Sequence, residues 1–344
     1  MLCAHSLSQL GVAQRSAQGY RQLGIAQRPP QGYHPARCTP SAEALRCAQA
    51  EQLDFFAAEG FNEIDTARMY AGGDTEDMLG RVLEGRDAIS VTATKANPFN
   101  GESLSPEGVR AQLEASLAAM NKESCEIFYL HAPDPDVPIE DTLAEVQKMY
   151  EEGKFKQLGL SNYQSWEVVH IYHVCLAKGW VLPTIYQGMY NALTREVERE
   201  LLPCLSKLGI RFVAYNPLAA GVLTGKHKSI EQVPEGRFKD NEMYLDRYWN
   251  ETYLTLDECV DACDAAGITM TDAAFRWLKC HSMLDASKAD GIIIGASSME
   301  HLKENVELCK KTEPLPDAVL AALDKAWDNC APVCPPYERG FSRL

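Results

Sequence analysis

The chain has 344 residues, of which 46% are hydrophobic and 24% are charged, the composition of an ordinary globular protein that can bury one large core. Its longest apolar runs, such as residues 291–296, are far shorter than the roughly 18 residues that a membrane-spanning helix needs. The formal net charge of −15 argues against general binding of nucleic acid. We therefore expect a protein that acts on small molecules, with neither a membrane nor a nucleic acid as partner.

The chain contains 12 cysteines, but no two of them form a CxxC pair. The closest pairs are Cys259/Cys263 and Cys330/Cys334, and neither has histidines at zinc-finger spacing. We expect reduced, buried thiols in a reducing compartment such as the cytoplasm, with a redox-sensing role for some of them as the alternative. No metal is expected.

The first forty residues differ from the rest of the chain. Residues 1–42 contain no acidic residue, whereas four arginines are spread among Gln, Gly, Ser and Pro. The run QLGVAQR at residues 9–15 returns as QLGIAQR at residues 22–28. Two copies are too few for a repeat array, so residues 1–40 are predicted to be a low-complexity extension. The alternatives are a disordered segment, an Arg-rich signal for mitochondria or another organelle, and a misassigned start of the reading frame.

From residue 41 onward, amphipathic helices alternate with short runs rich in β-branched and aromatic residues. The pattern predicts helices at residues 42–59, 76–84, 106–120, 139–152, 166–178, 195–208 and 271–279, and a further helix that starts at residue 299. Strands are predicted at residues 61–65, 89–95, 127–131, 157–161, 184–187, 211–215 and 291–295. Such alternation indicates parallel strands joined by crossover helices, the α/β class.

Polar residues at the ends of these strands distinguish between the two architectures that the alternation allows. The polar or aromatic residues that follow the apolar runs are Asp65, Lys95, His131, Ser161, Asn162, Gln187, Tyr215 and Asn216. In a barrel these ends meet at the face where barrel enzymes place their active sites. A doubly wound nucleotide-binding sheet would carry GxGxxG after its first strand, and the sequence has no such run. We predict a (β/α)8 TIM-type barrel over residues 41–344.

Only seven strands are evident in this range, so the first strand of the barrel is atypical or missing. Residues 10–12 and residues 23–25 are the two candidates for it, and both lack a polar ending. A barrel that is open at one strand would expose backbone hydrogen-bonding groups and core side chains. We therefore expect the stability of the barrel to depend on whether the N-terminal segment supplies this strand.

Asp65, Tyr70, Lys95 and His131 are expected at the same end of neighbouring strands. An ammonium group near a phenol favours the phenolate, so Lys95 would lower the pKa of Tyr70 and make it a better proton donor. Asp65 can supply the counter-charge of Lys95, and His131 can orient a carbonyl oxygen by a hydrogen bond. Each residue alone has an ordinary structural explanation, but the set together suits carbonyl reduction.

The motifs that carry these residues closely resemble those of the aldo-keto reductases. They are NEIDTARMY at 62–70, ATK at 93–95, YLH at 129–131 and GLSN at 159–162. Within that family, KANP at 95–98, FYLHAPD at 128–134, EGKF at 152–155 and YQGMYN at 186–191 look like the aflatoxin aldehyde reductase subfamily, which also reduces succinic semialdehyde. The resemblance covers about residues 41–339.

The resemblance implies an NADPH-dependent aldehyde reductase. It implies that Tyr70 is the general acid, that Lys95 and Asp65 tune it, and that His131 positions the carbonyl group. The implied cofactor-binding residues are Ser161, Asn162, Gln187, Tyr215, Asn216, Leu218, Gly221, Lys226, Ser297, Ser298, Glu304 and Asn305. Two positions depart from the family, because Arg68 replaces an apolar residue and His301 replaces the usual Gln.

Segments that resemble the substrate loop and the C-terminal segment of the subfamily carry Tyr244, Arg247 and Arg339. An arginine fork binds a planar carboxylate, so we expect Arg339, helped by Arg247, to favour aldehydes with a distal acid. Two solvated surface arginines are the alternative. The resemblance also implies a homodimer. The rival functions are a non-catalytic cofactor-binding subunit like the potassium-channel β-subunits, which share the barrel, and an inactive relative.

Overall fold

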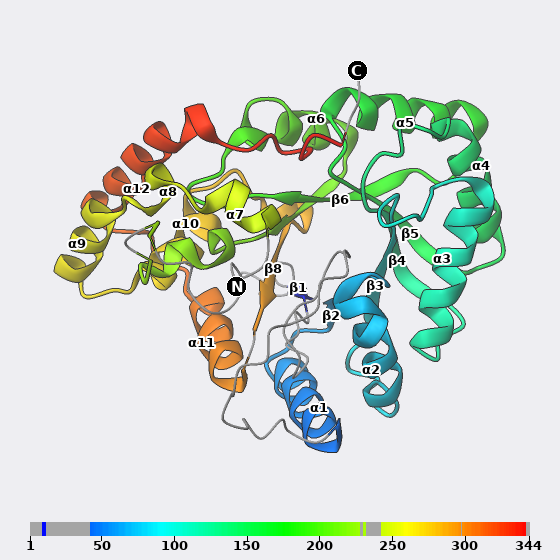
Figure 1. Cartoon of the computed structure of the whole chain (residues 1–344), viewed down its shortest axis with the longest axis horizontal. Coiled ribbons are helices and arrows are strands. Elements are labelled where there is room, and N and C mark those ends of the chain that lie inside the picture. The colour runs from blue at the N-terminus through cyan, green and yellow to red at the C-terminus, as the bar shows by residue number, and fades with distance from the viewer. Residues whose placement is uncertain (1–8, 12–41, 228–229, 232–241, 297, 342–344) are drawn as a thin grey trace, which may run out of the picture.

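Eight parallel strands form a closed barrel in the order β1 to β8 (Figure 1). The computed structural model describes residues 9–11, 42–227, 230–231, 242–296 and 298–341. The strands are β1 (Gln9–Gly11), β2 (Glu63–Asp65), β3 (Val91–Ala96), β4 (Cys125–Leu130), β5 (Phe155–Ser161), β6 (Pro183–Met189), β7 (Arg211–Tyr215) and β8 (Gly291–Gly295). The predicted barrel is confirmed, and β7 and β8 have the predicted bounds.

The helices surround the strands on the outside of the barrel (Figure 1). They are α1 (Ala42–Ala58), α2 (Asp74–Val82), α3 (Pro106–Ala119), α4 (Ile139–Glu151), α5 (Ser165–Lys178), α6 (Leu201–Leu208), α7 (Glu242–Tyr248), α8 (Glu251–Leu254), α9 (Asp257–Ala266), α10 (Met270–Cys280), α11 (Met299–Lys310) and α12 (Asp317–Cys330). Within the described ranges, none of them is both long and apolar enough to cross a membrane.

The first strand of the barrel, Gln9–Gly11, overlaps the first of the two candidate segments, residues 10–12. Leu10 pairs with Ile64 of β2 on one side and with Ile294 of β8 on the other, so β1 closes the ladder. Gln9–Gly11 thus belongs to the barrel although it lies within the segment that the sequence assigned to an extension. The second candidate, residues 23–25, and the remainder of residues 1–41 lie outside the described residues.

The predicted helix at residues 195–208 is wrong in its first half. The structure has a short 3₁₀ turn, η2 (Glu196–Glu198), and α6 begins only at Leu201. Glu200, just before α6, has a non-helical backbone, and Pro203 then falls in the first turn of the helix. Proline is tolerated there because the first-turn N–H groups have no partner inside the helix.

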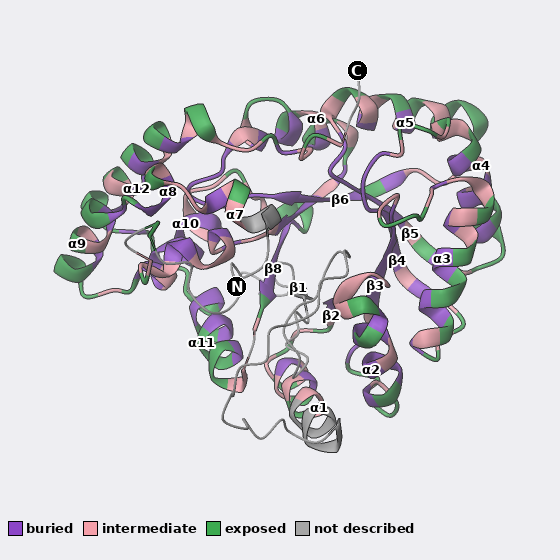
Figure 2. Cartoon of the chain, viewed as in Figure 1, coloured by how far each residue is buried: buried purple, intermediate pink, exposed green. Residues whose placement is uncertain are grey.

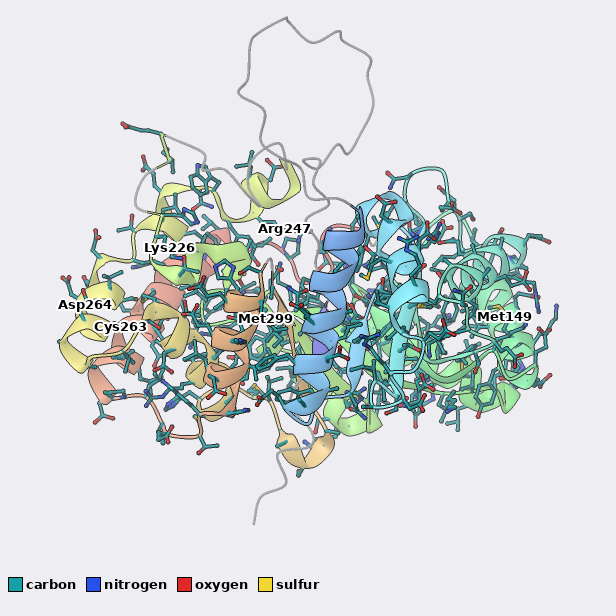
Figure 3. All side chains as sticks on the ribbon, turned by 90° about the horizontal axis from the view of Figure 1, so that it is seen from below. Met149, Lys226, Arg247, Cys263, Asp264 and Met299 are labelled. Atoms are coloured by element: carbon teal, nitrogen blue, oxygen red, sulfur yellow. The ribbon has the colours of Figure 1, made fainter. Side chains whose placement is uncertain are left out.

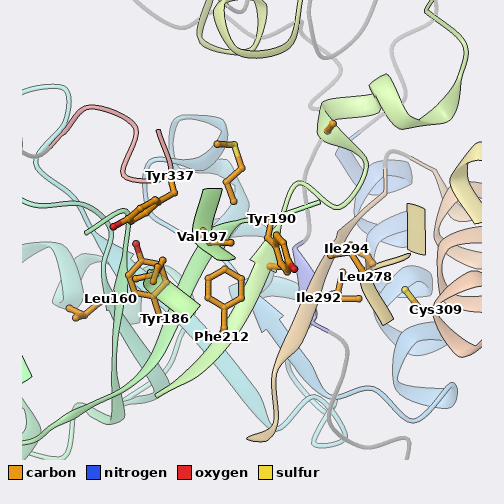
Figure 4. Packing of buried hydrophobic residues seen from close by; sticks show 14 of the residues in the cluster. Leu160, Tyr186, Tyr190, Val197, Phe212, Leu278, Ile292, Ile294, Cys309 and Tyr337 are labelled. Atoms are coloured by element: carbon orange, nitrogen blue, oxygen red, sulfur yellow. The ribbon is translucent and has the colours of Figure 1, made fainter. Parts of the chain in front are cut away.

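Most residues of strands β2 to β8 are buried on both faces, whereas the helices expose their outer sides (Figure 2). Side chains of a strand alternate between its two faces. The inner face carries a buried cluster made of Ala93, Ile127, Tyr129, Ile185, Val213 and Ile293. The outer face packs on the helices, and Figure 4 shows a part of that packing in which Phe212 stacks on Tyr186 with their ring centroids 5.9 Å apart. Lys95 and His131 each stand two residues beyond an inward-facing residue, so the alternation turns them toward the barrel axis.

Candidate active site

Asp65 and Lys95 form a buried ion pair at the carboxyl ends of β2 and β3. Lys95 Nζ lies 2.6 Å from Asp65 Oδ2, and the exposed fractions of the two side chains are 0% and 4%. The same ammonium group donates to the backbone carbonyl of Thr66 at 2.7 Å. Gln187, at the end of β6, donates from Nε2 to the other carboxylate oxygen of Asp65 at 2.8 Å. The carboxylate is therefore held from both sides.

Tyr70 lies against this pair in the turn η1 (Tyr70–Gly73). Its ring centroid is 4.9 Å from Lys95 Nζ. Ala71, Gly72 and Gly73 all have positive φ, which turns the chain sharply before α2 begins. Arg68 stabilises this turn, because its Nη1 donates to the carbonyl of Gly73 and to Asp77 Oδ1, both at 2.8 Å. Arg68, which replaces an apolar residue of the family, thus stabilises the loop that carries Tyr70.

The environment of Lys95 keeps its ammonium group charged. Complete burial lowers the pKa of Lys95, but the charge of Asp65 and the hydrogen bonds with Asp65 and Tyr70 raise it, and the net direction is upward. A buried cation needs such a counter-charge, since desolvation alone would favour the neutral amine. A positive charge is therefore maintained beside the Tyr70 ring at neutral pH.

His131 directly follows β4, and its ring lies next to the rings of Tyr70 and Phe99. Its ring meets the Tyr70 ring edge-on, with the centroids 6.1 Å apart. Burial, followed by the positive charges of Lys95 and Arg339, lowers the pKa of His131 well below its ordinary value. The imidazole is neutral near pH 7 and can donate one N–H hydrogen bond. All four residues of the predicted proton-donating site are brought together.

Ser161, Asn162 and Tyr215 form a polar group beside His131. Asn162 has a φ of 60°, and its Nδ2 donates to the backbone carbonyl of His131 at 2.8 Å and to Ser161 Oγ at 2.9 Å. The Tyr215 hydroxyl donates to Asn162 Oδ1 at 2.9 Å. Hydrogen bonds from β5, β7 and the residue after β4 thus converge on the Asn162 amide, next to the site formed by Asp65, Tyr70, Lys95 and His131.

The loop after β7 presents a donor that has no partner within the described residues. Asn216 has a φ of 57°, and its Nδ2 is buried without a hydrogen bond there. The chain then runs through η3 (Ala219–Thr224), where Ala220 and Gly221 are left-handed, to the exposed Lys226. A buried, unsatisfied amide next to a tight turn fits a polar ligand, since such a group is otherwise costly. Half-buried Leu218 lies at the start of this turn.

The start of α11 is the third part of the predicted cofactor site. Ser298 caps the helix, with its Oγ accepting from the backbone N–H of His301 at 3.2 Å. Asn305 is buried and donates to the carbonyl of Gly295 at 3.2 Å, whereas Glu304 is exposed. Ser297 lies outside the described residues. Asn305 therefore ties α11 to the end of β8, and the capped N-terminus of the helix has the polarity that suits an anion.

Comparison with known proteins agrees with this geometry. The model of the aldo/keto reductase family matches residues 40–328. The chain belongs to the aldo-keto reductase family. It is 46% identical over 306 residues to aflatoxin B1 aldehyde reductase member 2 of Rattus norvegicus, a match that covers 85% of this chain and 83% of the relative. It is 44% identical over 298 residues to human aldo-keto reductase family 7 member A3, covering 83% and 90%. It is an oxidoreductase of a family that uses nicotinamide cofactors.

The predicted substrate residues of this aldo-keto reductase are only partly brought together. Arg339 lies close enough to His131 for its charge to act on the imidazole. Arg247 is half-buried on α7, where its charge acts on the neighbouring Tyr248. In Figure 3, Arg247 and Lys226 lie on the same side of the molecule, away from Met149 of α4. Tyr244 is on α7 as well, but its side chain is not among those described.

Sequence reasoning missed the floor of the site, which Tyr129 forms. Its ring is buried inside the barrel, with its centroid 5.7 Å from Lys95 Nζ. Tyr129 pairs in register with Gly159 of β5, and a Cβ atom at Gly159 would come within 2.3 Å of the Tyr129 ring. Glycine is thus required where the ring crosses the strand. The sequence contains Gly159 in the GLSN motif, but the residue that lies against it depends on the register of the two strands.

A hollow of about 560 Å³ lies at the opposite end of the barrel. It is lined by the end of α3, the end of α4 and the residues that lead into β4 and β5, among them Lys122, Ser124 and Lys154. These are the amino ends of the strands, where barrel residues serve stability rather than chemistry. We assign it no part in the reaction.

Proposed function

We propose that this aldo-keto reductase uses NADPH to reduce aldehydes to alcohols, with Tyr70 as the proton donor, and that it acts on dialdehydes and on aldehydes that carry a carboxylate. The observation that carries the proposal is the buried Lys95–Asp65 pair in contact with Tyr70, 2.6 Å between the charged atoms. A structural ion pair does not need a phenol held over its ammonium group, whereas proton donation does.

The positions of Tyr70, Lys95, Asp65 and His131 suit the donation of a proton to a carbonyl group. The Tyr70 hydroxyl gives its proton to the carbonyl oxygen, and the Lys95 ammonium stabilises the phenolate that remains. Asp65 holds Lys95 in place through the 2.6 Å contact. Neutral His131 donates a hydrogen bond to the same carbonyl oxygen and so orients the substrate. The reduced nicotinamide, when bound, supplies the hydride that the carbonyl carbon receives.

The residues near the strand ends fit a dinucleotide. Ser161, Asn162 and Gln187 would hold the carboxamide, and half-buried Tyr215 would stack on the nicotinamide ring. The unpaired Nδ2 of Asn216 and the turn that contains Gly221 would meet the pyrophosphate, with exposed Lys226 as a nearby cation. The start of α11, which Ser298 caps, would hold the adenosine end of the cofactor. By their resemblance to the family, Ser297, Glu304 and Asn305 would take part. We propose NADPH rather than NADH because this helix start can hold the adenosine 2′-phosphate, which only NADPH carries.

Arg339 is the proposed binding site for a carboxylate. Its charge acts on His131, and the rings of Phe99 and Phe341 link the two residues, so an acid at one end of the substrate would pair with Arg339 while its carbonyl group meets His131 and Tyr70. Arg247 and Tyr244 are proposed as helpers from the α7 side. The relatives in rat and human are named as reductases of aflatoxin B1 aldehyde, which supports an aldehyde as the substrate.

Turnover by the purified protein tests the proposal. Succinic semialdehyde and butanal have the same four-carbon chain and differ in the distal acid, so oxidation of NADPH and of NADH should be measured with each. We expect faster oxidation of NADPH than of NADH, and a lower KM for succinic semialdehyde than for butanal. Cofactor binding without turnover of either aldehyde would contradict the proposal and would favour the non-catalytic subunit.

A further inference from the structure

Glu76, in the first turn of α2, carries a carboxyl group that takes no part in the proposed reaction. Its side chain is fully buried. The Thr94 hydroxyl of β3 donates to Glu76 Oε1 at 2.6 Å, whereas Glu76 Oε2 accepts no hydrogen bond within the described residues. A buried carboxyl group with an unpaired oxygen is costly to the fold. Its presence there points to a role other than core packing.

The surroundings of Glu76 indicate a hydrogen-bonded attachment rather than a counter-charge. Burial raises the pKa of Glu76, the hydroxyl groups of Thr94 and Ser116 lower it, and the net direction is upward. The charges of Arg68 and Lys95 act on this pKa less than either hydroxyl group does. Thr94 belongs to β3 and Ser116 to α3, so Glu76 ties the start of α2 to both elements.

β3 holds the chain on both sides of the turn η1. Before the turn, the N–H of Thr66 donates to the carbonyl of Ala93 at 2.9 Å. After the turn, Glu76 accepts the hydrogen bond from Thr94, the next residue of β3. Residues 67–75 therefore form a loop that one strand fixes at its two ends.

The turn has a backbone that needs such support. Ala71 has a φ of 51°, a left-handed conformation that residues other than glycine rarely adopt. Strained backbone of this kind persists only where the surrounding structure holds it. Thr75 directly precedes Glu76, and its Oγ1 donates to the carbonyl of Tyr70 at 3.1 Å. The attachment at Glu76 thus reaches the backbone of Tyr70 through the neighbouring residue.

The same attachment lies beside Lys95. Thr94 directly precedes Lys95, and the alternation along a strand turns their side chains to opposite faces of β3. Lys95 faces the barrel axis, with its Nζ 4.9 Å from the centroid of the Tyr70 ring. Thr94 and Glu76 therefore lie on the outer side of the strand, away from a substrate in the barrel mouth. Glu76 can act on the reaction only through the positions of Tyr70 and Lys95.

We propose that Glu76 is a positioning residue for the proton donor, because it fixes the turn η1 to β3 and so keeps the Tyr70 hydroxyl beside Lys95. The inference rests on the proposed function, since it takes Tyr70 as the proton donor. Loss of the attachment would let Tyr70 move without removing a group that binds cofactor or substrate. A displacement of about 1 Å between reacting groups can lower a rate about a hundredfold.

The experiment compares the full chain with two variants at this position. Glu76→Leu keeps the bulk but cannot accept the hydrogen bond from Thr94, whereas Glu76→Gln keeps a carbonyl oxygen that can. Val82→Ala is the matched control, because Val82 is also buried on α2 but lies at its opposite end. It should lower the urea midpoint without moving the turn.

The first readout is the separation of kcat from binding, with succinic semialdehyde as the substrate. Glu76→Leu should lower kcat about ten- to a hundredfold and leave the Kd of NADPH and the KM of the aldehyde unchanged. Glu76→Gln should keep most of the kcat of the unchanged protein, and Val82→Ala should keep all of it.

The second readout is hydrogen exchange of the backbone over residues 67–75, followed by mass spectrometry. In this loop the N–H of Tyr70 bonds to the carbonyl of Ala67 at 2.9 Å, and that of Gly72 to the carbonyl of Met69 at 3.3 Å. Local opening of the turn exposes both groups to exchange. Exchange should be faster in Glu76→Leu than in the unchanged protein, Glu76→Gln and Val82→Ala.

An unchanged kcat in Glu76→Leu would overturn the inference, and so would equal losses of kcat in Glu76→Leu and Val82→Ala. A loss as large in Glu76→Gln would also overturn it, because a charge rather than an acceptor would then be required. Failure of the proposed function looks different. The unchanged protein would oxidise no NADPH with the aldehyde, and hydrogen exchange would still decide whether Glu76 fixes the turn.

Discussion

Replacing Lys95 with methionine tests whether the ion pair at the centre of the site is as deeply buried as the geometry indicates. Methionine keeps the length and apolar stem of the side chain and removes only the ammonium group. That change deletes the contacts to Asp65 Oδ2 at 2.6 Å and to the Thr66 carbonyl at 2.7 Å. Asp65, 4% exposed, is left with a charge that the Gln187 amide alone must satisfy.

Breaking a buried pair on one side costs about 3–5 kcal/mol, because the remaining charge stays out of water. We expect Lys95→Met to lower the free energy of unfolding by about that amount in urea titrations followed by circular dichroism. Lys325→Met is the matched control, since Lys325 and Glu258 also approach to 2.6 Å but are 61% and 68% exposed. A surface pair contributes about 0–1 kcal/mol.

A second variant and the pH dependence test whether the lost stability of Lys95→Met comes from the uncompensated charge of Asp65. Adding Asp65→Asn should recover part of the lost stability, because the uncompensated charge is then gone. The pKa of Lys95 is raised in the folded protein, so the pair stabilises fully below pH 10.5 and its contribution falls as the pH rises above that value. The gap between the unchanged protein and Lys95→Met should therefore narrow at high pH. A loss below 1 kcal/mol, no larger than for Lys325→Met, would refute the buried pair.

Three other perturbations test neighbouring features. Gly159→Ala should lower the free energy of unfolding by about 1–3 kcal/mol, because the new Cβ atom would come within 2.3 Å of the Tyr129 ring. Tyr129→Leu should offset that loss in the double variant. If the losses of the two single variants simply add in the double variant, the contact is contradicted. Deleting residues 1–11 should lower the urea midpoint because β1 pairs with both β2 and β8, whereas deleting residues 1–8 should not; equal midpoints would show that the barrel does not need β1. Arg339→Ala should raise KM for succinic semialdehyde by the equivalent of about 1.5–3 kcal/mol and affect butanal less, and equal rises would point to a structural role.

The parts of the structure that sequence predicts are those in which local pattern and topology agree. β7 and β8 are apolar runs between clear boundaries, and their bounds are as predicted. Asp65, Lys95 and His131 could be grouped from the sequence, because a barrel brings the carboxyl ends of its strands to one face. Strand order therefore predicts this group of three, whereas Tyr70 lies in the turn η1 after β2 and was assigned from the motif at residues 62–70 that resembles the family.

The remaining features depend on contacts between distant parts of the chain. β1 is only three residues long, and its place is decided by pairing with β2 and β8 rather than by its own pattern. The fit of Tyr129 over Gly159 depends on the register of two strands, which a single sequence does not give. Phe341 reaches Phe99 from the far end of the chain, and no spacing in the sequence indicates that contact.

We propose that Tyr70 gives the proton while Asp65, Lys95 and His131 hold and tune it. Tyr70→Phe removes the hydroxyl and keeps the ring that lies over Lys95. The most direct measurement is single-turnover reduction of succinic semialdehyde by the unchanged protein and by Tyr70→Phe, with NADPH binding measured separately by fluorescence. We expect normal NADPH binding and a rate at least about a hundredfold lower in the variant, the scale of general acid catalysis. A rate within a few fold of the unchanged protein, with NADPH bound normally, would contradict it.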